Sequence, residues 1–148
     1  MSENQESGFS ARKEKQGKYK GMPLVYSCSG CSSVAQLANA LAVRLDREEL
    51  AEMSCIAGVG GGVKALVKTA KSQRPILALD GCPLHCTLHC LEQQGVEPTV
   101  HVDLSTFGLR KRFHEDALPE EQAYAWEQAI EPALDQLNSP PIERAKSA

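Results

Sequence analysis

The amino-acid sequence predicts a single three-layer α/β domain with a mostly parallel sheet of about four strands. Two observations support this class. Between residues 22 and 137, short apolar runs alternate with segments of helical periodicity, as they do when helices connect parallel strands. The length of 148 residues is also enough for one domain to bury a core without help from disulfides or a metal.

Two β-α units are predicted in the first half of the domain. Residues 22–27 form the first strand. In the helix that follows, apolar residues recur at i, i+3, i+4, i+7 and i+11, which places them on one face: Val34, Leu37, Ala38, Leu41 and Leu45. Residues 53–57 are the second predicted strand, 58–62 a glycine loop, and 63–70 a second helix with similar spacing.

The second half continues the alternation. Residues 76–80 are the third predicted strand. A third helix is expected to start at Pro83, since proline suits the first helical turn, and to stop at Gly95, since glycine suits a left-handed C-cap. Residues 99–104 supply the fourth strand. A last helix follows, and we expect it to bend or restart at Pro132 because proline lacks a backbone N–H.

Both ends of the chain are expected to be tails. Residues 1–21 lack periodicity and are rich in Ser, Gln, Lys and Gly, which predicts a disordered N-terminal tail. Residues 138–148 include Ser139-Pro140-Pro141 and predict a frayed C-terminal tail. The ordered domain is therefore expected over residues 22–137.

Charge and composition exclude several functional classes. The net charge of −3 gives no general attraction to nucleic acid or to anionic membranes. The first twenty residues have no apolar core, so they predict no secretory signal, and no apolar run approaches the roughly 20 residues that span a bilayer. We therefore expect a cytoplasmic protein, in which six cysteines serve metal ligation or thiol chemistry rather than structural disulfides.

The cysteines follow the ends of the predicted strands. All six lie within the first three β-α units, at positions 28, 31, 55, 82, 86 and 90. Cys28 follows the first strand, Cys55 lies in or just after the second, and Cys82 follows the third. Because the carboxyl ends of parallel strands share one edge, and open α/β sheets bind ligands there, these side chains are expected to meet.

The predicted third helix adds two further cysteines. Cys82 and Cys86 would be one helical turn apart, about 6 Å along the axis, and could share one ion. Cys90 would lie about 12 Å from Cys82, too far for the same ion. Cys28 and Cys82 each precede a predicted helix, whose positive end would lower a thiol pKa and favour thiolate.

Thiolates suit a soft metal, and zinc is the metal we expect. The predicted ligands are Cys28, Cys55, Cys82 and Cys86, with Cys31 as a substitute or additional thiol. The site would serve structure, metal handling or an interface with a protein partner. Two alternatives remain open: an iron–sulfur cluster, and a thiol redox protein in which Cys28 and Cys31 cycle between dithiol and disulfide with Cys82 as a resolving thiol.

Other polar residues near the cysteines have a structural or a functional interpretation. His85 and His89 are candidate ligands, although exposed histidines on helices are common. Asp80 could support a ligand or cap the helix after its strand. His101 is expected to be structural, and the basic run over 110–112 to be a solvated face.

Residues 58–64 contain four glycines followed by a lysine, which suggests a phosphate loop. The lysine comes too early for G-x-x-x-x-G-K-[ST], and an alanine follows it. We therefore interpret these glycines as allowing a close approach to the metal or to neighbouring loops.

The motifs Asp80-Gly81-Cys82-Pro83, with Cys86 following, and Cys28-Ser29-Gly30-Cys31 resemble the DGC-domain family, named for its Asp-Gly-Cys triplet. The resemblance covers roughly residues 24–113. It implies a small bacterial-type protein whose cysteines serve as zinc ligands, including a cysteine after the second strand that Cys55 matches. It implies no established reaction.

Overall fold

The computed structural model describes residues 17 and 19–141. At its centre is a four-stranded sheet in the order β2-β1-β3-β4, and every neighbouring pair of strands is parallel. The strands are β1 (Leu24–Ser27), β2 (Glu52–Met53), β3 (Ile76–Asp80) and β4 (Val100–Asp103). The predicted α/β class and the parallel sheet are confirmed.

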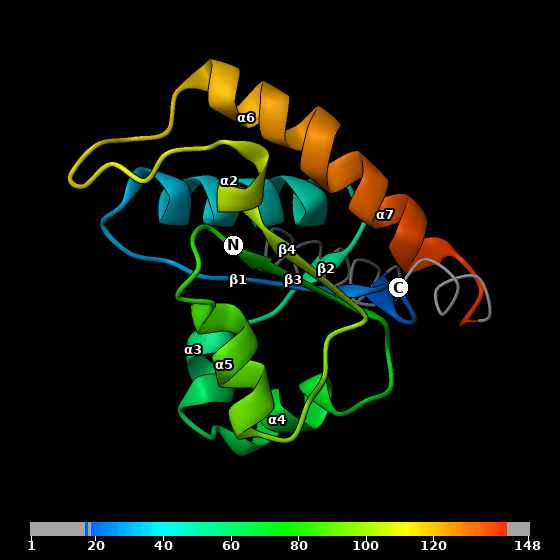
Figure 1. The fold of residues 1–148 in the computed structure, drawn as a ribbon. Coiled ribbons are helices and arrows are strands. Elements are labelled where there is room, and N and C mark those ends of the chain that lie inside the picture. The colour runs from blue at the N-terminus through cyan, green and yellow to red at the C-terminus, as the bar shows by residue number, and fades with distance from the viewer. Residues whose placement is uncertain (1–16, 18, 142–148) are drawn as a thin grey trace, which may run out of the picture.

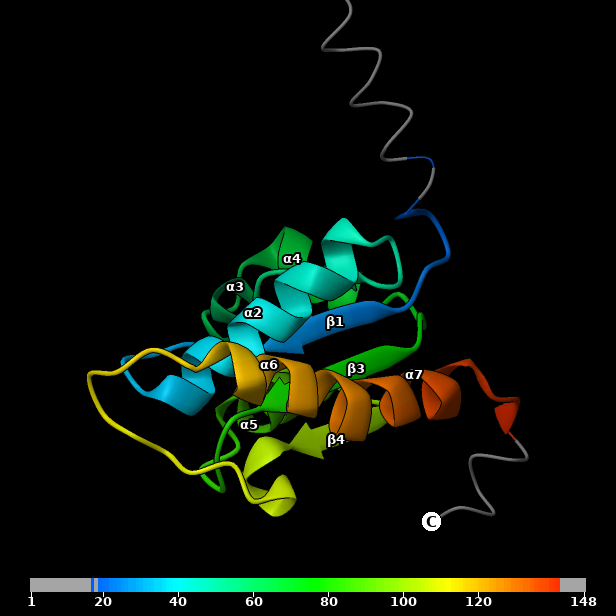
Figure 2. The same ribbon diagram turned by 90° about the horizontal axis from the view of Figure 1, so that it is seen from above.

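Helices cover both faces of this sheet (Figure 1, Figure 2). One face carries α2 (Ser33–Arg47) and the C-terminal helical segments α6 (Pro119–Ala125), η2 (Trp126–Ile130) and α7 (Glu131–Asn138). The other face carries α3 (Ile56–Gly60), α4 (Lys64–Ala70) and α5 (Cys86–Gln93), and a short 3-10 turn, η1 (Leu104–Phe107), follows β4. The three predicted layers are present.

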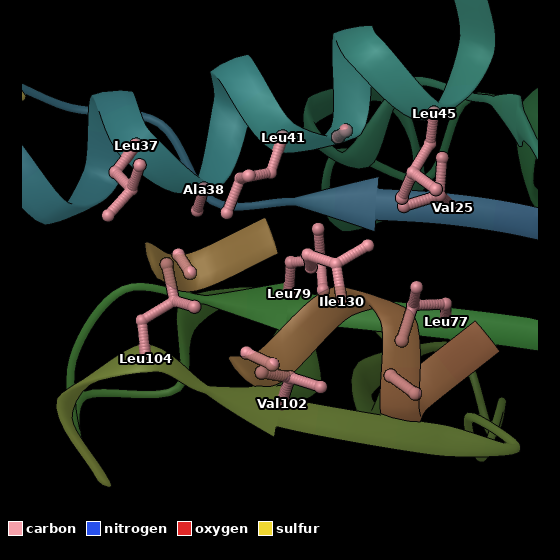
Figure 3. Packing of buried hydrophobic residues seen from close by; sticks show 14 of the residues in the cluster. Val25, Leu37, Ala38, Leu41, Leu45, Leu77, Leu79, Val102, Leu104 and Ile130 are labelled. Atoms are coloured by element: carbon pink, nitrogen blue, oxygen red, sulfur yellow. The ribbon is translucent and has the colours of Figure 1, made fainter. Parts of the chain in front are cut away.

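The larger core lies between the sheet and α2. Side chains of β1 and β3 that point to this face meet the apolar stripe of α2 and Ile130 of the C-terminal helix (Figure 3). Leu37 and Leu45 are fully buried, as the i, i+3, i+4 pattern predicts. A fully buried leucine stabilises a fold by roughly 1.5–3 kcal/mol, so this stripe fixes α2 above the sheet.

The second core lies under α3, α4 and α5 and includes Tyr26, Val59 and Leu91. Here two glycines permit close helix packing. A Cβ at Gly58 would collide with the Leu66 side chain, and one at Gly60 would lie 2.8 Å from the Cys90 Sγ. The prediction of a loop over 58–62 is wrong in part, because residues up to Gly60 are helical and the close approach is between helices.

β2 is shorter than the strand predicted over residues 53–57, because it ends at Met53. Cys55 is instead the N-cap of α3, and its Sγ accepts the Gly58 N–H at 3.4 Å. The thiol therefore replaces the hydroxyl or carboxylate that usually satisfies the first turn of a helix.

The helix predicted from Pro83 begins only at Cys86. Pro83 lies in a turn, and His85 has a left-handed backbone (φ 52°) that separates this turn from α5. Gly95 has φ 70° and follows the end of the helix, as predicted. Cys82 and Cys86 therefore do not share one helix, and the prediction that they are one helical turn apart is wrong.

The C-terminal helix passes through Pro132 without a break. A π-helical segment, η2, immediately precedes α7, and Pro132 lies in the first turn of α7, where a missing N–H costs little. Trp126 of η2 packs under the Arg44 guanidinium, 3.6 Å from its Cζ to the ring centroid. The predicted restart at Pro132 is therefore absent, and the irregularity of the helix is the π-helical segment that ends two residues earlier.

The predicted tails fall largely on residues 1–16, 18 and 142–148, which lie outside the described residues. At the described end, the Tyr19 hydroxyl donates to the Asp46 carbonyl at 3.0 Å, and Arg74 donates to the Tyr19 carbonyl at 3.0 Å. No helix within residues 17 and 19–141 is long and apolar enough to cross a bilayer.

Candidate functional site

Three adjacent strands deliver cysteines to one edge of the sheet. Cys28 follows β1, Cys55 comes two residues after β2, and Cys82 comes two residues after β3. β1 lies between β2 and β3, so the strand order reverses at the β1–β3 pair. Open α/β sheets bind ligands outside the carboxyl ends of the strands at such a switch point. The name thiol edge is used below for these three cysteines together with Cys31 and Cys86.

Cys28 is the innermost thiol of the edge. It is buried, and its Sγ accepts the Gly81 N–H at 3.3 Å. Burial raises the pKa of Cys28 to about 11, even though the Gly81 hydrogen bond acts in the opposite direction. The predicted lowering by a helix end is wrong, because α2 starts only at Ser33 and burial dominates.

Gly81 is held against the first turn of α2. A Cβ at this position would lie 2.5 Å from the Val34 carbonyl oxygen and 3.0 Å from the Ala35 nitrogen. Only glycine allows the loop after β3 to pass here and present its N–H to Cys28. The middle residue of the Asp-Gly-Cys triplet therefore fixes where the following cysteine lies.

Cys82 is half-buried, and its Sγ accepts a hydrogen bond from the Lys111 Nζ at 3.6 Å. Lys111 belongs to the basic run predicted to be a solvated face, and its ammonium also lies 5.1 Å from the centroid of the Phe113 ring. The ammonium can stabilise negative charge on this sulfur when the sulfur acts as a nucleophile or as a metal ligand. Sequence reasoning missed Lys111, because it is 29 residues from Cys82 with no periodic relation to it.

The other three thiols of the edge are exposed to solvent. Cys31, Cys55 and Cys86 are exposed, and the Cys31 carbonyl accepts the His114 N–H at 3.3 Å. Cys90 is half-buried on α5 beside Gly60, and burial raises the pKa of its thiol. Cys90 thus packs between helices, in agreement with its interpretation as a small hydrophobic residue.

Two histidine–aspartate pairs lie at the ends of β3 and β4. Asp80 is buried; its carboxylate accepts the Thr87 and Leu88 N–H groups at 2.8 and 3.2 Å and lies 2.8 Å from the His101 Nε2. Burial acts to raise the pKa of Asp80, but these hydrogen bonds outweigh it and hold the pKa below the usual value. The interpretation of Asp80 as the cap of the following helix is confirmed.

His85 is engaged in the second pair. Its Nε2 lies 2.9 Å from the Asp103 Oδ2, and its ring packs edge-on against His101 with centroids 4.7 Å apart. His89 is exposed on α5. Sequence reasoning missed Asp103, which the strand-end argument could have found, because Asp103 is the register partner of Asp80.

The donor chemistry of the thiol edge suits zinc, but its geometry does not assemble a metal site. Within the described part of the chain, no three His, Cys, Asp or Glu side chains are grouped so that they could hold an ion. The Ser27 hydroxyl beside Cys28 is buried without a hydrogen-bond partner among these residues, yet a hydroxyl is a hard donor that zinc does not favour. Metal binding at this edge would require its loops to move.

The comparisons with known proteins agree with the Asp-Gly-Cys motif. The family model described as DGC domain matches residues 24–129. A Pseudomonas aeruginosa protein named "Anaerobic and virulence modulator AnvM" is 68% identical over 95 residues, which are 64% of this chain and 72% of that protein. No solved structure matches the chain. Because the family match covers most of the chain, the protein belongs to the DGC-domain family.

Proposed function

We propose that this chain is a thiol-based regulatory protein in which Cys82 is the reactive thiol. The observation that carries the proposal is the Lys111 ammonium 3.6 Å from the Cys82 Sγ, at the switch point of a parallel sheet. The ammonium donates to the sulfur and can stabilise negative charge that forms on it during attack, and partial exposure leaves the sulfur open to small oxidants.

Cys28 is the natural second thiol. Its raised pKa of about 11 makes it slow to attack a dissolved oxidant at neutral pH, so Cys28 suits the later step, in which it attacks a sulfur of the same molecule that is already oxidised. Its Sγ also lies against the N–H of Gly81, the residue before Cys82. We therefore assign the first step to Cys82 and the second to Cys28.

The oxidant would be a peroxide. The Cys82 thiolate attacks one peroxide oxygen, the O–O bond breaks, and a sulfenic acid forms while the departing oxygen takes up a proton. The Cys28 sulfur then attacks the Cys82 sulfur, an S–S bond forms, and hydroxide leaves as water with the Cys28 proton. The two thiols lose two electrons and the peroxide gains them.

A regulatory role is supported by the similar protein from Pseudomonas aeruginosa. Its name, "Anaerobic and virulence modulator", describes modulation rather than a metabolic reaction. A thiol pair that responds to oxidants would suit such a role here, because its oxidation state changes with the supply of oxidants.

The test is the rate at which each cysteine of the reduced protein reacts with iodoacetamide, followed by peptide mass spectrometry. We expect Cys82 to react fastest, and Lys111→Met to slow it at least about threefold. Lys68→Met, which removes an exposed lysine of α4, is the matched control and should change nothing. Equal rates for Cys82 in the Lys111→Met variant and the parent would refute the assignment.

The second step is tested by adding one equivalent of hydrogen peroxide and mapping disulfides. We expect two free thiols to disappear and a Cys28–Cys82 disulfide to form. Cys82→Ser should prevent the loss, whereas Cys90→Ser should not. If the Cys82→Ser variant instead forms a Cys28–Cys31 disulfide as fast as the parent protein loses its two thiols, the redox pair expected from the sequence would be supported.

Zinc binding is the second candidate function, and the delivery of thiols by three adjacent strands favours it. Cys28, Cys55, Cys82 and Cys86 would hold the ion, with Cys31 as an additional thiol; thiolate-bound zinc would stabilise the loops of this edge. Anaerobic purification with elemental analysis tests it. Zinc is expected to be retained and to be lost in Cys82→Ser/Cys86→Ser. A brown protein that contains iron would indicate the iron–sulfur alternative.

A further inference from the structure

The exposed side of α4 forms a basic groove away from the described thiol chemistry. Lys64, Lys68 and Lys71 recur at i, i+4 and i+7, so they follow one side of the helix over about 10 Å. These lysines line a groove of about 660 Å³, together with Val67 and with Gln94 from the end of α5. The name basic groove is used below for this surface.

The charge of the basic groove is local and uncompensated. Between Glu52 and Asp80 the sequence contains four basic residues and no acidic one, although the whole chain has a net charge of −3. The fourth basic residue, Arg74, is paired with Glu52 at 2.7 Å. None of the ion pairs found within residues 17 and 19–141 involves the three lysines of the groove.

We propose that the basic groove docks an acidic amphipathic segment of a partner protein. Three cations spaced over two helical turns match carboxylates at the same spacing on a bound helix, and Val67 offers an apolar contact between them. A carboxylate-bearing helix with an apolar stripe satisfies both features at once. This inference does not depend on the thiol chemistry proposed above.

Other polyanions fit the groove less well. Nucleic acid binding depends mainly on phosphate contacts, to which the apolar side chain of Val67 would contribute nothing. The net negative charge of the chain also opposes the binding of a long polyanion. An anionic membrane favours a helix that carries Trp, Phe or Leu on its apolar face, whereas the described residues that line this groove include no aromatic one.

The experiment selects short random peptides displayed on phage against the immobilised full-length protein. We expect the selected sequences to carry Glu or Asp at helical spacing around Leu, Ile or Phe. The best peptide is then synthesised, and its affinity is measured by fluorescence anisotropy. The triple variant Lys64→Glu/Lys68→Glu/Lys71→Glu should weaken binding at least about tenfold, and so should about 0.5 M salt.

Control variants distinguish a loss of docking from a loss of folding and from a non-specific effect of the change in net charge. Lys20→Glu/Arg47→Glu changes two exposed cations elsewhere and should leave the affinity unchanged, and far-UV circular dichroism should show that every variant is folded. Val67→Asp should weaken binding without altering the lysines. Selected peptides that lack acidic residues, or that bind the triple variant as well as the parent, would overturn the proposal. Tighter lysine-dependent binding of a DNA duplex, of phosphatidylglycerol vesicles or of a second copy of the chain would overturn it as well.

Discussion

Asp80, Gly81 and Cys82 are consecutive residues whose atoms lie in three different environments. The Asp80 carboxylate faces α5 and His101, the Gly81 backbone passes the first turn of α2, and the Cys82 sulfur lies beside Lys111. Each of the three contacts belongs to a different part of the fold. A substitution at any one of these three residues should therefore disturb a different part of the fold.

Replacing Gly81 tests the tightest of these contacts. We expect Gly81→Ala to lower the free energy of unfolding by about 1–3 kcal/mol, because the new methyl group would meet the Val34 carbonyl oxygen at 2.5 Å and the backbone must shift. Gly30→Ala is the control, since a Cβ there meets only the Ala35 Cβ at 3.9 Å. Urea unfolding measures both. Equal stabilities for the two variants would contradict the close approach.

Some of these residue-level contacts could be predicted from the sequence. The alternation of apolar runs with segments of helical periodicity predicts that three cysteines follow strand ends, namely Cys28, Cys55 and Cys82. The environment of Cys28 could not be predicted, because its burial depends on how the loop after β3 folds over it. Lys111 could not be found either, since the contact it makes is between segments that are distant in sequence.

At the level of secondary structure, the long periodic elements are predicted well and the short ones are not. α2 extends one residue before and two residues beyond the predicted apolar stripe from Val34 to Leu45, because that stripe is long and regular. α3 contains two glycines in five residues and would not form a helix by intrinsic propensity. It forms because glycine lets its backbone pack against α4 and α5, a tertiary effect that local sequence does not reveal.

The contact between α3 and α5 can be tested by a double-mutant cycle at Gly60 and Cys90. Gly60→Ala should destabilise the protein by about 1–3 kcal/mol, despite the better helix propensity of alanine, because its Cβ would lie 2.8 Å from the Cys90 Sγ. In a Cys90→Ala background the same change should cost clearly less. Additive effects in urea unfolding would show that the two residues do not press on each other.

The segment before α6 is anchored electrostatically. The Arg112 guanidinium donates to both Glu121 carboxylate oxygens, at 2.6 and 3.1 Å, and the Glu121 Oε1 also accepts the Leu118 N–H at 2.9 Å. The hydrogen bonds from Arg112 hold the pKa of Glu121 below its ordinary value of 4.5. A carboxylate with a depressed folded-state pKa stabilises the fold above its unfolded pKa, and this stability is lost as pH falls through the folded pKa.

Glu121→Gln should therefore lower the urea midpoint at pH 7, and this deficit should be smaller at about pH 3, because the parent loses the stabilising charge as pH falls through the folded pKa. Glu120→Gln alters the exposed neighbour and should change neither value. The measurement is urea unfolding at the two pH values. A deficit for Glu121→Gln that persists in acid would mean that the side chain acts through packing rather than charge.

The whole molecule has a core on each side of its sheet, and these cores consist mainly of aliphatic side chains; of the proposed metal ligands, Cys28 belongs to the larger core and Cys82 packs against it. This layered architecture could be predicted, since alternating strands and helices permit few alternatives. The order β2-β1-β3-β4 was not predicted, because strand pairing is a non-local choice that local periodicity does not encode. That order is what places Cys28 between the other strand-end cysteines.

Removal of bound metal should therefore leave the protein folded. If zinc is present after anaerobic purification, we expect chelation to leave the far-UV circular dichroism unchanged and to speed amide hydrogen exchange in residues 28–33 and 58–62. The physical reason is that the buried apolar core, rather than the ion, supplies the stability. A cooperative loss of helical signal on chelation would identify the site as a structural staple.

The segment after η1 joins the Cys28–Cys31 loop to the longest helical rod of the molecule. Ser32 and Phe113 form an antiparallel bridge. The Ser33 N–H donates to the Arg112 carbonyl, and the Arg112 N–H donates to the Ser33 hydroxyl. Arg112 in turn binds Glu121 in α6. That helix continues through η2 and α7 over the face of the sheet that also carries α2 (Figure 2). This chain of contacts connects the cysteine loop to the start of the C-terminal helix. A shift of the loop would therefore act first on Arg112 and, through its hydrogen bonds to Glu121, on the start of α6.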